Sequence, residues 1–338
     1  MHINVGGTRN VLELANQAND VKAFVHVSTA YNMCPGIVDE KVYPTNIEPE
    51  VALDFFAKMP ADWNASITKT ILKDKISTYA YSKHMGEKVV ERAWNNLPVT
   101  IVRPGAISSA MTEPLPGWNE TESSSSKWLR RLFDGSYHTV LANSQGRFEL
   151  TPVDYTANTC LAAAWRLGNS IPKKFHVYNC VPNRMTNPVM LRDWIKWGCE
   201  SLRVGKLRTY YPTISKNPTR FDINNYLFRK IPGQFRSIMK HGSDQNFQKD
   251  YNEAQILART FKIAIINNWE FVTANMTELN QLMDPLDRQL FPIDFDQIDW
   301  KLFTQYLVHG LYSYEKHLNT SDLSSPNYTK NIVEFPTL

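Results

Sequence analysis

Apolar residues in the first hundred positions follow two patterns in turn. Residues 5–15 place their apolar side chains at helical spacings, which predicts a helix. Residues 23–27, Ala-Phe-Val-His-Val, form a short β-branched and aromatic run between polar residues, which predicts a buried strand. Residues 66–95 return to a helical pattern, and residues 99–102 form a second buried run before Arg-Pro-Gly. The order helix, strand, helix, strand predicts βαβ units and a parallel sheet.

The remaining chain has a weaker strand pattern at residues 175–179 and a serine run at Ser123–Ser126, which we interpret as a loop. Residues 205–255 are basic and irregular, and two interpretations stay open: a solvated helical surface, or a contact with a membrane surface or an anionic ligand. We therefore expect four parts, namely a sheet-bearing domain, an irregular connecting region, a helical C-terminal domain and a flexible tail. Their predicted bounds are 1–200, 201–256, 257–318 and 319–338.

Composition narrows the class of protein. The chain has 338 residues, 43% of them hydrophobic, which is enough for a sizeable core and excludes a disordered chain. A net charge of +4 excludes a nucleic-acid binder that relies on bulk charge. The four cysteines lie far apart with no CxxC spacing, which argues against a disulfide scaffold and a structural zinc site and favours a reduced, intracellular compartment. No apolar run approaches the roughly 18 residues of a membrane span.

One pair of side chains points to chemistry. Tyr79 and Lys83 are four residues apart in a predicted helix and therefore share a face. A nearby ammonium stabilises phenolate, so we expect a lowered pKa for Tyr79 and proton exchange with a substrate oxygen. The same spacing occurs at Tyr226/Lys230 and Tyr312/Lys316, so the spacing alone is weak.

The context distinguishes the first pair from the other two. Only Tyr79/Lys83 lies between two buried strands. Ser28 and Thr29 follow the first strand, and Pro104-Gly105-Ala106 follow the second. Because sites in open parallel sheets lie at the carboxyl ends of strands, we expect these residues to meet in one pocket, where a hydroxyl stabilises a developing oxyanion.

The ordered set of motifs resembles the extended short-chain dehydrogenases, and more closely the fatty acyl-CoA reductases. The matching motifs are Asn4-Val-Gly-Gly-Thr8, Val25-His-Val-Ser-Thr-Ala-Tyr31, Tyr79-Ala-Tyr-Ser-Lys83, Val102-Arg-Pro-Gly105 and Glu113-Pro-Leu-Pro-Gly-Trp118, with further similarity at Thr151-Pro-Val-Asp154 and Ile298-Asp-Trp300. The resemblance runs from residue 1 to about 318 and is least clear over 205–255. It implies an α/β fold with a Rossmann-type parallel sheet and a helical C-terminal domain.

The resemblance also implies roles for particular residues. Tyr79 would be the general acid, with Lys83 as its partner and as a ribose ligand. Thr29 or Ser28 would bind the substrate oxygen, and Asn4 would support the lysine through a water. Pro104, Gly105 and Ala106 would line the nicotinamide pocket. The implied reaction is NADPH-dependent reduction of a long-chain fatty acyl-CoA, through the aldehyde, to a primary alcohol with release of coenzyme A.

One family feature is missing. The sequence has no G-x-x-G-x-x-G or G-x-G-x-x-G, the glycine-rich turn that lets a pyrophosphate approach a helix N-terminus. We therefore expect that the first strands of the sheet are missing. Either the chain is a fragment or truncated gene model of an active reductase, or it is a shortened isoform that is non-catalytic and binds lipid or a partner.

Other expectations stay broader. A sterol- or sugar-acting member of the same superfamily is the second enzyme hypothesis. The resemblance implies the cytosolic face of the endoplasmic reticulum or the peroxisomal membrane, with peripheral membrane contact. We predict no metal and no nucleic-acid partner, and the sequence does not indicate an oligomeric state.

Overall fold

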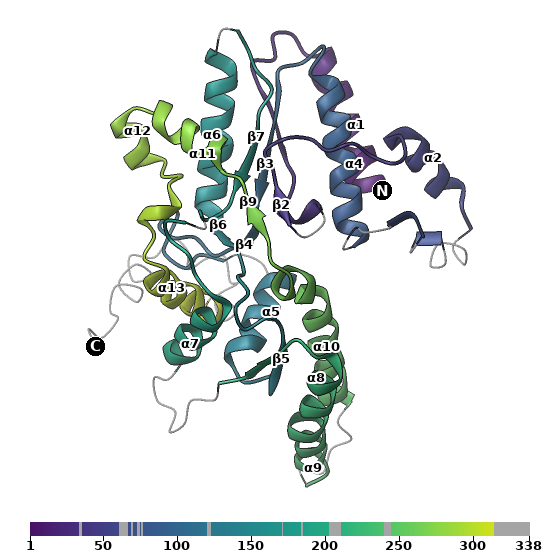
Figure 1. Ribbon diagram of the computed structural model, residues 1–338, viewed down its shortest axis with the longest axis vertical. Coiled ribbons are helices and arrows are strands. Elements are labelled where there is room, and N and C mark those ends of the chain that lie inside the picture. Colours follow the sequence, from purple (N-terminus) through teal and green to yellow (C-terminus); the bar gives the residue numbers. More distant parts are fainter. Residues whose placement is uncertain are drawn as a thin grey trace, which may run out of the picture.

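The computed structural model describes residues 1–33, 36–60, 67–68, 70–72, 75, 77–119, 123–170, 172–183, 185–202, 211–239 and 245–313 (Figure 1). Its centre is a three-stranded parallel sheet in the order β1-β3-β7, formed by β1 (Phe24–Val27), β3 (Val99–Pro104) and β7 (Val177–Cys180). Phe24 pairs with Val99, and Ile101 pairs with Val177. The α/β fold with a Rossmann-type parallel sheet is thereby confirmed.

Helices cover both faces of this sheet, as Figure 1 shows. The π-helix η1 (His2–Gly7), α1 (Thr8–Gln17) and α4 (Thr78–Ala93) lie on one side, and α6 (Val153–Asn169) lies on the other. All six residues of β3 are buried, as expected for a strand covered on both faces. One apolar cluster joins Leu12, Met85 and Val90 of the helices to Ile101 of β3. Each such side chain contributes about 1.5–3 kcal/mol by burial.

Three short pairs of parallel strands lie outside this sheet. They are β2 (Ile37–Val38) with β9 (Glu270–Phe271), β4 (Ala106–Ser108) with β6 (Leu150–Pro152), and β5 (Thr139–Leu141) with β8 (Thr213–Ser215). The first pair connects segments more than two hundred residues apart. The C-terminal part of the chain therefore packs directly against the loop that follows β1.

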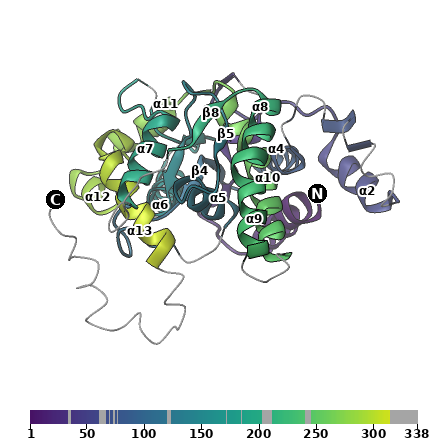
Figure 2. The same cartoon turned by 90° about the horizontal axis from the view of Figure 1, so that it is seen from below.

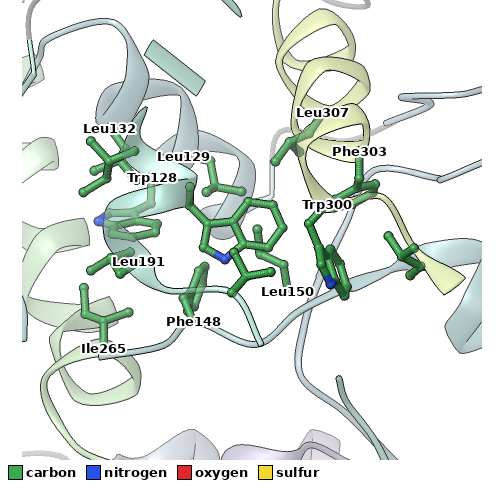
Figure 3. Packing of buried hydrophobic residues seen from close by; sticks show 14 of the residues in the cluster. Trp128, Leu129, Leu132, Phe148, Leu150, Leu191, Ile265, Trp300, Phe303 and Leu307 are labelled. Carbon is green, nitrogen blue, oxygen red and sulfur yellow. The ribbon is translucent and has the colours of Figure 1, made fainter. Parts of the chain in front are cut away.

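A second, larger core lies below the sheet in Figure 1. It is formed by α5 (Ser124–Phe133), α7 (Leu191–Ser201), α10 (Gln245–Ile266) and α13 (Trp300–Ser313). Figure 3 shows Trp128 and Phe148 in this core, with Trp300 and Phe303 of α13 beside them. The Trp128 ring stacks on Phe261 with centroids 5.1 Å apart, and Phe148 meets Trp128 edge-on at 5.2 Å. The predicted helical C-terminal region is thus present and shares one core with α5 and α7.

One local prediction is wrong. The serine run is not a loop, because Ser123 caps α5 by accepting a hydrogen bond from the Ser126 amide.

The stretch 205–255, for which a helical surface was one of two interpretations, is helical over much of its described part. It contains α8 (Pro218–Asn225), η3 (Tyr226–Lys230), α9 (Ile231–Met239) and the start of α10. Asn217 caps α8 through the amides of Thr219 and Arg220, with Pro218 at the first helical position.

The remaining elements are short. They are η2 (Ala30–Asn32), α2 (Pro49–Lys58), α11 (Ala274–Leu282), α12 (Pro285–Leu290) and η4 (Phe295–Gln297). The predicted tail, residues 319–338, lies outside the described residues, and the four predicted domain bounds stay a prediction. Within the part of the chain that the structure describes, no helix is long and apolar enough to cross a membrane.

Candidate active site

A cavity of about 1080 Å³ lies at the carboxyl ends of β1 and β3. Six of the predicted site residues line it: Ser28, Thr29, Tyr79, Pro104, Gly105 and Ala106. They come from three separate elements, the ends of β1 and β3 and the start of α4. Lys83 and Asn4 do not line the cavity but lie behind it on or against α4. The structure thus brings together residues that the sequence linked only through strand order.

Tyr79 stands at the rim of the cavity in the first turn of α4. Ser77 begins this helix by accepting a hydrogen bond from the Ala80 amide. The Tyr79 side chain keeps 53% of its surface exposed while it borders the cavity. Partial burial raises the pKa of Tyr79 above its ordinary value, so the expectation of a lowered pKa is wrong. The phenol is consequently protonated at neutral pH and suited to donate its proton.

Lys83 explains why the tyrosine pKa is not lowered. Its Nζ donates a hydrogen bond to the Val27 carbonyl at the end of β1, at 2.9 Å, and lies 6.0 Å from the centroid of the Tyr79 ring. Burial lowers the pKa of the Lys83 amine, against which the charge of Glu87 raises it. The ammonium has three donors, and the contact with Val27 uses one. Lys83 therefore joins α4 to the strand end and retains donors for a ligand.

Ser28 and Thr29 form the buried wall opposite α4. The Ser28 amide donates to the Val102 carbonyl at 2.8 Å, which continues the β1–β3 pairing by one residue. The Ser28 hydroxyl accepts from Asn32 Nδ2 at 3.2 Å, and the Thr29 hydroxyl accepts from the Tyr31 amide at 3.3 Å. The Thr29 hydroxyl is anchored as an acceptor, so its own proton is available to a substrate oxygen, whereas the Ser28 hydroxyl donates its proton to the Glu87 carboxylate.

Asn4 packs against α4 next to Lys83. Its Nδ2 donates to the Ser82 hydroxyl at 2.9 Å, and that hydroxyl donates to the Tyr79 carbonyl at 2.9 Å. The close approach of η1 requires Gly86, because a Cβ there would lie 2.9 Å from the Asn4 carbonyl oxygen. Asn4 thus braces the turn of α4 that carries Tyr79 and Lys83.

A buried ion pair underlies the site, and the sequence analysis missed it. Arg103 Nε and Nη2 donate to the two carboxylate oxygens of Glu87 at 2.7 and 2.6 Å, and both side chains are 0% exposed. Burial raises the pKa of the Glu87 carboxyl, but the charge and hydrogen bonds of Arg103 and a hydrogen bond from Ser28 outweigh it, so this pKa is below its ordinary value. Asn32 also donates to Glu87. The signal was available, since Glu87 follows Lys83 by four residues.

Gly105 lines the cavity with its backbone, since it has no side chain. A Cβ at this position would lie 2.3 Å from the Glu149 carbonyl oxygen, so only glycine fits. The Gly105 amide donates to the Thr151 hydroxyl at 3.1 Å, and that hydroxyl donates to the Cys180 carbonyl at 3.1 Å. The end of β3 is therefore fixed against both β6 and β7.

The far wall of the cavity comes from elements that carried no predicted site residue. These lining residues lie on α5, on α10 and in the segments between β4 and β6, and they are Trp118, Asn119, Ser123–Ser126, Phe148, Ile256, Arg259, Thr260, Phe261 and Ala264. On α10, Ile256, Thr260 and Ala264 recur every four residues and so share one face. The sequence shows that periodicity, but it does not show that this face of α10 borders the same cavity as Tyr79.

Among the described residues, no group of three or more His, Cys, Asp or Glu side chains is arranged to hold a metal ion.

Comparison with known proteins shows what the chain is similar to. One family model, named for NAD binding and described as male sterility protein, matches residues 1–160, and a second male sterility model matches residues 234–316. The chain is 27% identical over 320 residues to a fatty acyl-CoA reductase named wat of Drosophila melanogaster and 29% identical over 350 residues to the human fatty acyl-CoA reductase 1. The chain is thus similar to fatty acyl-CoA reductases over nearly its whole length, and the two male sterility models together match most of it.

The chain covers only part of the length of these relatives. The alignments include 92% and 94% of the chain but 62% and 65% of the Drosophila and human reductases, so it spans less than two thirds of their length. Among solved structures, the reductase domain of a nonribosomal peptide synthetase from Mycobacterium tuberculosis superposes with a TM-score of 0.50 at 15% identity, over 91% of this chain and 65% of that one. This likeness supports the Rossmann-type fold.

Proposed function

We propose that this protein reduces the acyl group of a long-chain fatty acyl-CoA to a primary alcohol, through the aldehyde, with NADPH as reductant. The observation that carries the proposal is the cavity in which Tyr79, Ser28 and Thr29 meet Pro104–Ala106 at the carboxyl ends of adjacent parallel strands. The similarity to fatty acyl-CoA reductases supports an acyl thioester as substrate.

The residues present fit the nicotinamide and its ribose. Pro104, Gly105 and Ala106 line the cavity at the end of β3, where a flat ring could lie against them. Lys83 has spare donors beside this surface for ribose hydroxyls. The bound nicotinamide would supply hydride. A cavity of about 1080 Å³ is at the upper end of ordinary ligand sites, which leaves room for an acyl chain as well.

In the proposed reaction, side chains of the protein stabilise the negative charge that develops on the substrate oxygen and then protonate that oxygen. Hydride arriving at a carbonyl carbon leaves negative charge on its oxygen, which the hydroxyl of Thr29 would stabilise and the Tyr79 phenol would protonate. The raised pKa of Tyr79 suits this direction, because the residue must begin protonated. From a thioester, the first reduction gives a hemithioacetal that collapses with release of coenzyme A, and the second converts the aldehyde to the alcohol.

The test uses the full chain and its Tyr79→Phe variant. We expect wild type to consume NADPH with a long-chain acyl-CoA and Tyr79→Phe to be about 10²–10⁴-fold slower, the usual contribution of a general acid. Tyr226→Phe is the matched control, because Tyr226 also precedes a lysine by four residues but does not line the cavity. Turnover by Tyr79→Phe within a fewfold of wild type would remove this tyrosine from the reaction. Absence of NADPH binding by wild type would favour a non-catalytic, lipid- or partner-binding role for this chain.

The similarity to fatty acyl-CoA reductases also suggests a cellular location for the chain. Fatty acyl-CoA substrates support a place at the cytosolic face of the endoplasmic reticulum or of the peroxisome. Fractionation of cells expressing the tagged chain would test it, with recovery only in a membrane-free fraction as the contrary result.

A further inference from the structure

A second hollow, of about 520 Å³, lies between α10 and the helices α8 and η3. Its wall on α10 is formed by Tyr251, Gln255 and Arg259, which recur every four residues and therefore share one face. Figure 1 places α8 and α9 at the end of the molecule farthest from α1 and the central sheet, and Figure 2 shows α8, α9 and α10 side by side. None of the predicted site residues, all of which the structure describes, lines this hollow, which we call the outer hollow.

The outer hollow adjoins the large cavity, because Arg259 lines both. The neighbouring face of α10, formed by Ile256, Thr260 and Ala264, lines the large cavity. At 1.5 Å per residue this face is about 12 Å long. One side of α10 therefore leads from the outer hollow into the large cavity.

The C-terminal end of α10 lies close to the strand ends. The ring of Phe261 meets that of Phe148 edge-on, with centroids 6.1 Å apart. Glu149 follows Phe148, and its carbonyl accepts a hydrogen bond from the Ala106 amide at 2.8 Å. Ala106 belongs to the strand end where the proposed function places the nicotinamide. The cavity-lining face of α10 therefore runs from the strand ends outward to the outer hollow.

The side chains around the outer hollow are of the kinds that bind an adenine nucleotide. The Tyr251 ring offers a surface on which a purine stacks, and the Gln255 amide matches the N6 and N7 atoms of adenine. Lys230 Nζ lies 5.7 Å from the centroid of the Tyr251 ring, so a cation stands beside the stacking surface. Arg259 donates to Asp222 at 2.6 Å through Nη2, which leaves further N–H donors for a phosphate.

Charge at this end of the molecule favours an anionic ligand. Residues 216–235 contain four basic residues and one acidic residue, Asp222. The basic residues are Lys216, Arg220, Arg229 and Lys230. Because Asp222 is already paired with Arg259, an anion in the outer hollow meets an excess of positive charge.

We propose that the outer hollow binds the nucleotide end of coenzyme A, whose adenosine carries a 3′-phosphate and a 5′-pyrophosphate. The pantetheine arm then lies along the cavity-lining face of α10 and brings the thioester to the strand ends. The arm has about twelve bonds between pyrophosphate and sulfur and is about 14 Å long when extended, close to the roughly 12 Å of that face. This placement rests on the proposed function, in which a fatty acyl-CoA is the substrate.

NADPH also ends in an adenine nucleotide, but its expected place is different. In open parallel sheets a dinucleotide lies across the carboxyl ends of the strands. The described lining residues of the outer hollow come from α8, η3 and α10, and none of them belongs to the sheet. The outer hollow is therefore better placed for coenzyme A than for the cofactor.

Isothermal titration calorimetry of the full chain with coenzyme A, without NADPH or an acyl group, measures this binding independently of the proposed reaction. We expect wild type to bind coenzyme A and adenosine 3′,5′-bisphosphate. Arg259→Gln and Lys230→Gln should each bind coenzyme A about tenfold more weakly, because each loses a charge-assisted hydrogen bond to phosphate. Tyr251→Leu should also lose about tenfold, because the base loses its stacking surface.

Matched variants separate the outer hollow from general effects and should bind coenzyme A like wild type. Tyr251→Phe keeps the stacking ring. Arg192→Gln removes an arginine of α7 that is about as exposed as Arg259 and also lies beside an aspartate, but that lines neither the outer hollow nor the large cavity. Tyr226→Phe keeps the ring of a residue that borders the outer hollow, so it stays suitable as the turnover control.

Unchanged affinity of Arg259→Gln and Tyr251→Leu for coenzyme A, or no binding of coenzyme A by wild type, would overturn the proposal. A loss confined to adenosine 2′,5′-bisphosphate, the nucleotide end of NADPH, would also overturn it, because the outer hollow would then belong to the cofactor. Coenzyme A binding that depends on these residues, without NADPH consumption, would support the outer hollow and reject the proposed reaction. NADPH consumption with acyl-CoA by variants of unchanged affinity would do the reverse.

Discussion

Replacement of Arg103 by methionine should make the protein much less stable to urea, because Arg103 is fully buried in β3. The substitution removes the guanidinium that donates to both oxygens of Glu87 and leaves a carboxylate with 0% exposure and no cation beside it. Loss of one partner from a buried ion pair costs about 3–5 kcal/mol, because the remaining charge stays desolvated. Arg103 also donates to the carbonyls of Asp39 and Lys41 at 3.0 and 2.8 Å, so the loop after β2 loses its anchor as well.

The assay is urea unfolding followed by far-UV circular dichroism at fixed pH. With a slope of about 3 kcal/mol per molar urea, the loss shifts the midpoint by more than about 1 M. Arg92→Met is the control, since Arg92 lies on the same helix as Glu87 but forms exposed pairs with Glu48 and Glu50. An exposed pair contributes about 0–1 kcal/mol, so this variant should stay close to wild type.

The pH dependence of the stability gives an independent check, because its slope has opposite signs in wild type and in Arg103→Met. In wild type the pKa of Glu87 is below its ordinary value, so its contribution to stability is present above about pH 4.3, the pKa of an unfolded glutamate, and is lost as pH falls through the lower folded pKa. In Arg103→Met the largest lowering influence is removed, so burial outweighs the remaining hydrogen bond from Ser28 and raises the pKa of Glu87. The variant therefore loses stability as pH rises from the unfolded pKa through the raised one. A variant within 1 kcal/mol of wild type, or one with the same pH profile, would refute this account of the pair.

Two further predictions concern packing. Gly105→Ala should destabilise the protein by about 1–3 kcal/mol in the same unfolding assay, because the new Cβ would lie 2.3 Å from the Glu149 carbonyl oxygen. Gly7→Ala has open space around the new Cβ and should be neutral or slightly stabilising, so equal effects of the two substitutions would contradict the geometry. Burial raises the pKa of Cys180 and of Cys199 to about 12. Neither thiol should therefore react with iodoacetamide at pH 8 until urea is added, which peptide mass spectrometry would show. Rapid labelling of the native protein would mean that the packing around β7 and α7 admits solvent.

The sequence predicted those parts of the fold that local pattern determines. The strands at residues 23–27 and 99–102 and the helix that carries Tyr79 and Lys83 are present because each has its own periodicity and end signals. Their meeting at one cavity followed from a rule about parallel strands, and six of the predicted residues line that cavity.

The parts that the sequence did not reveal depend on contacts between distant segments. Ile256 and Phe261 of α10 border the same cavity as Tyr79, yet no local pattern links residues so far apart. The sequence left residues 205–255 open between a helical surface and a contact with a membrane or an anion, whereas the position of α8 depends on its packing against β5 as well as on the Asn217 cap and Pro218. The lowered tyrosine pKa was expected from spacing alone, whereas the Lys83 amine points to the Val27 carbonyl.

The geometry of α4 explains how one helix connects the surface to the core. Tyr79, Lys83 and Glu87 follow one another at intervals of four residues, so they lie on one face and go from a half-exposed phenol through a partly buried amine to a fully buried carboxylate. Burial lowers the pKa of Lys83, and the charge of Glu87 opposes that lowering. Glu87 in turn depends on Arg103, which belongs to the strand whose end forms the cavity. The pKa of the lysine behind the tyrosine therefore depends on the pairing of α4 with β3.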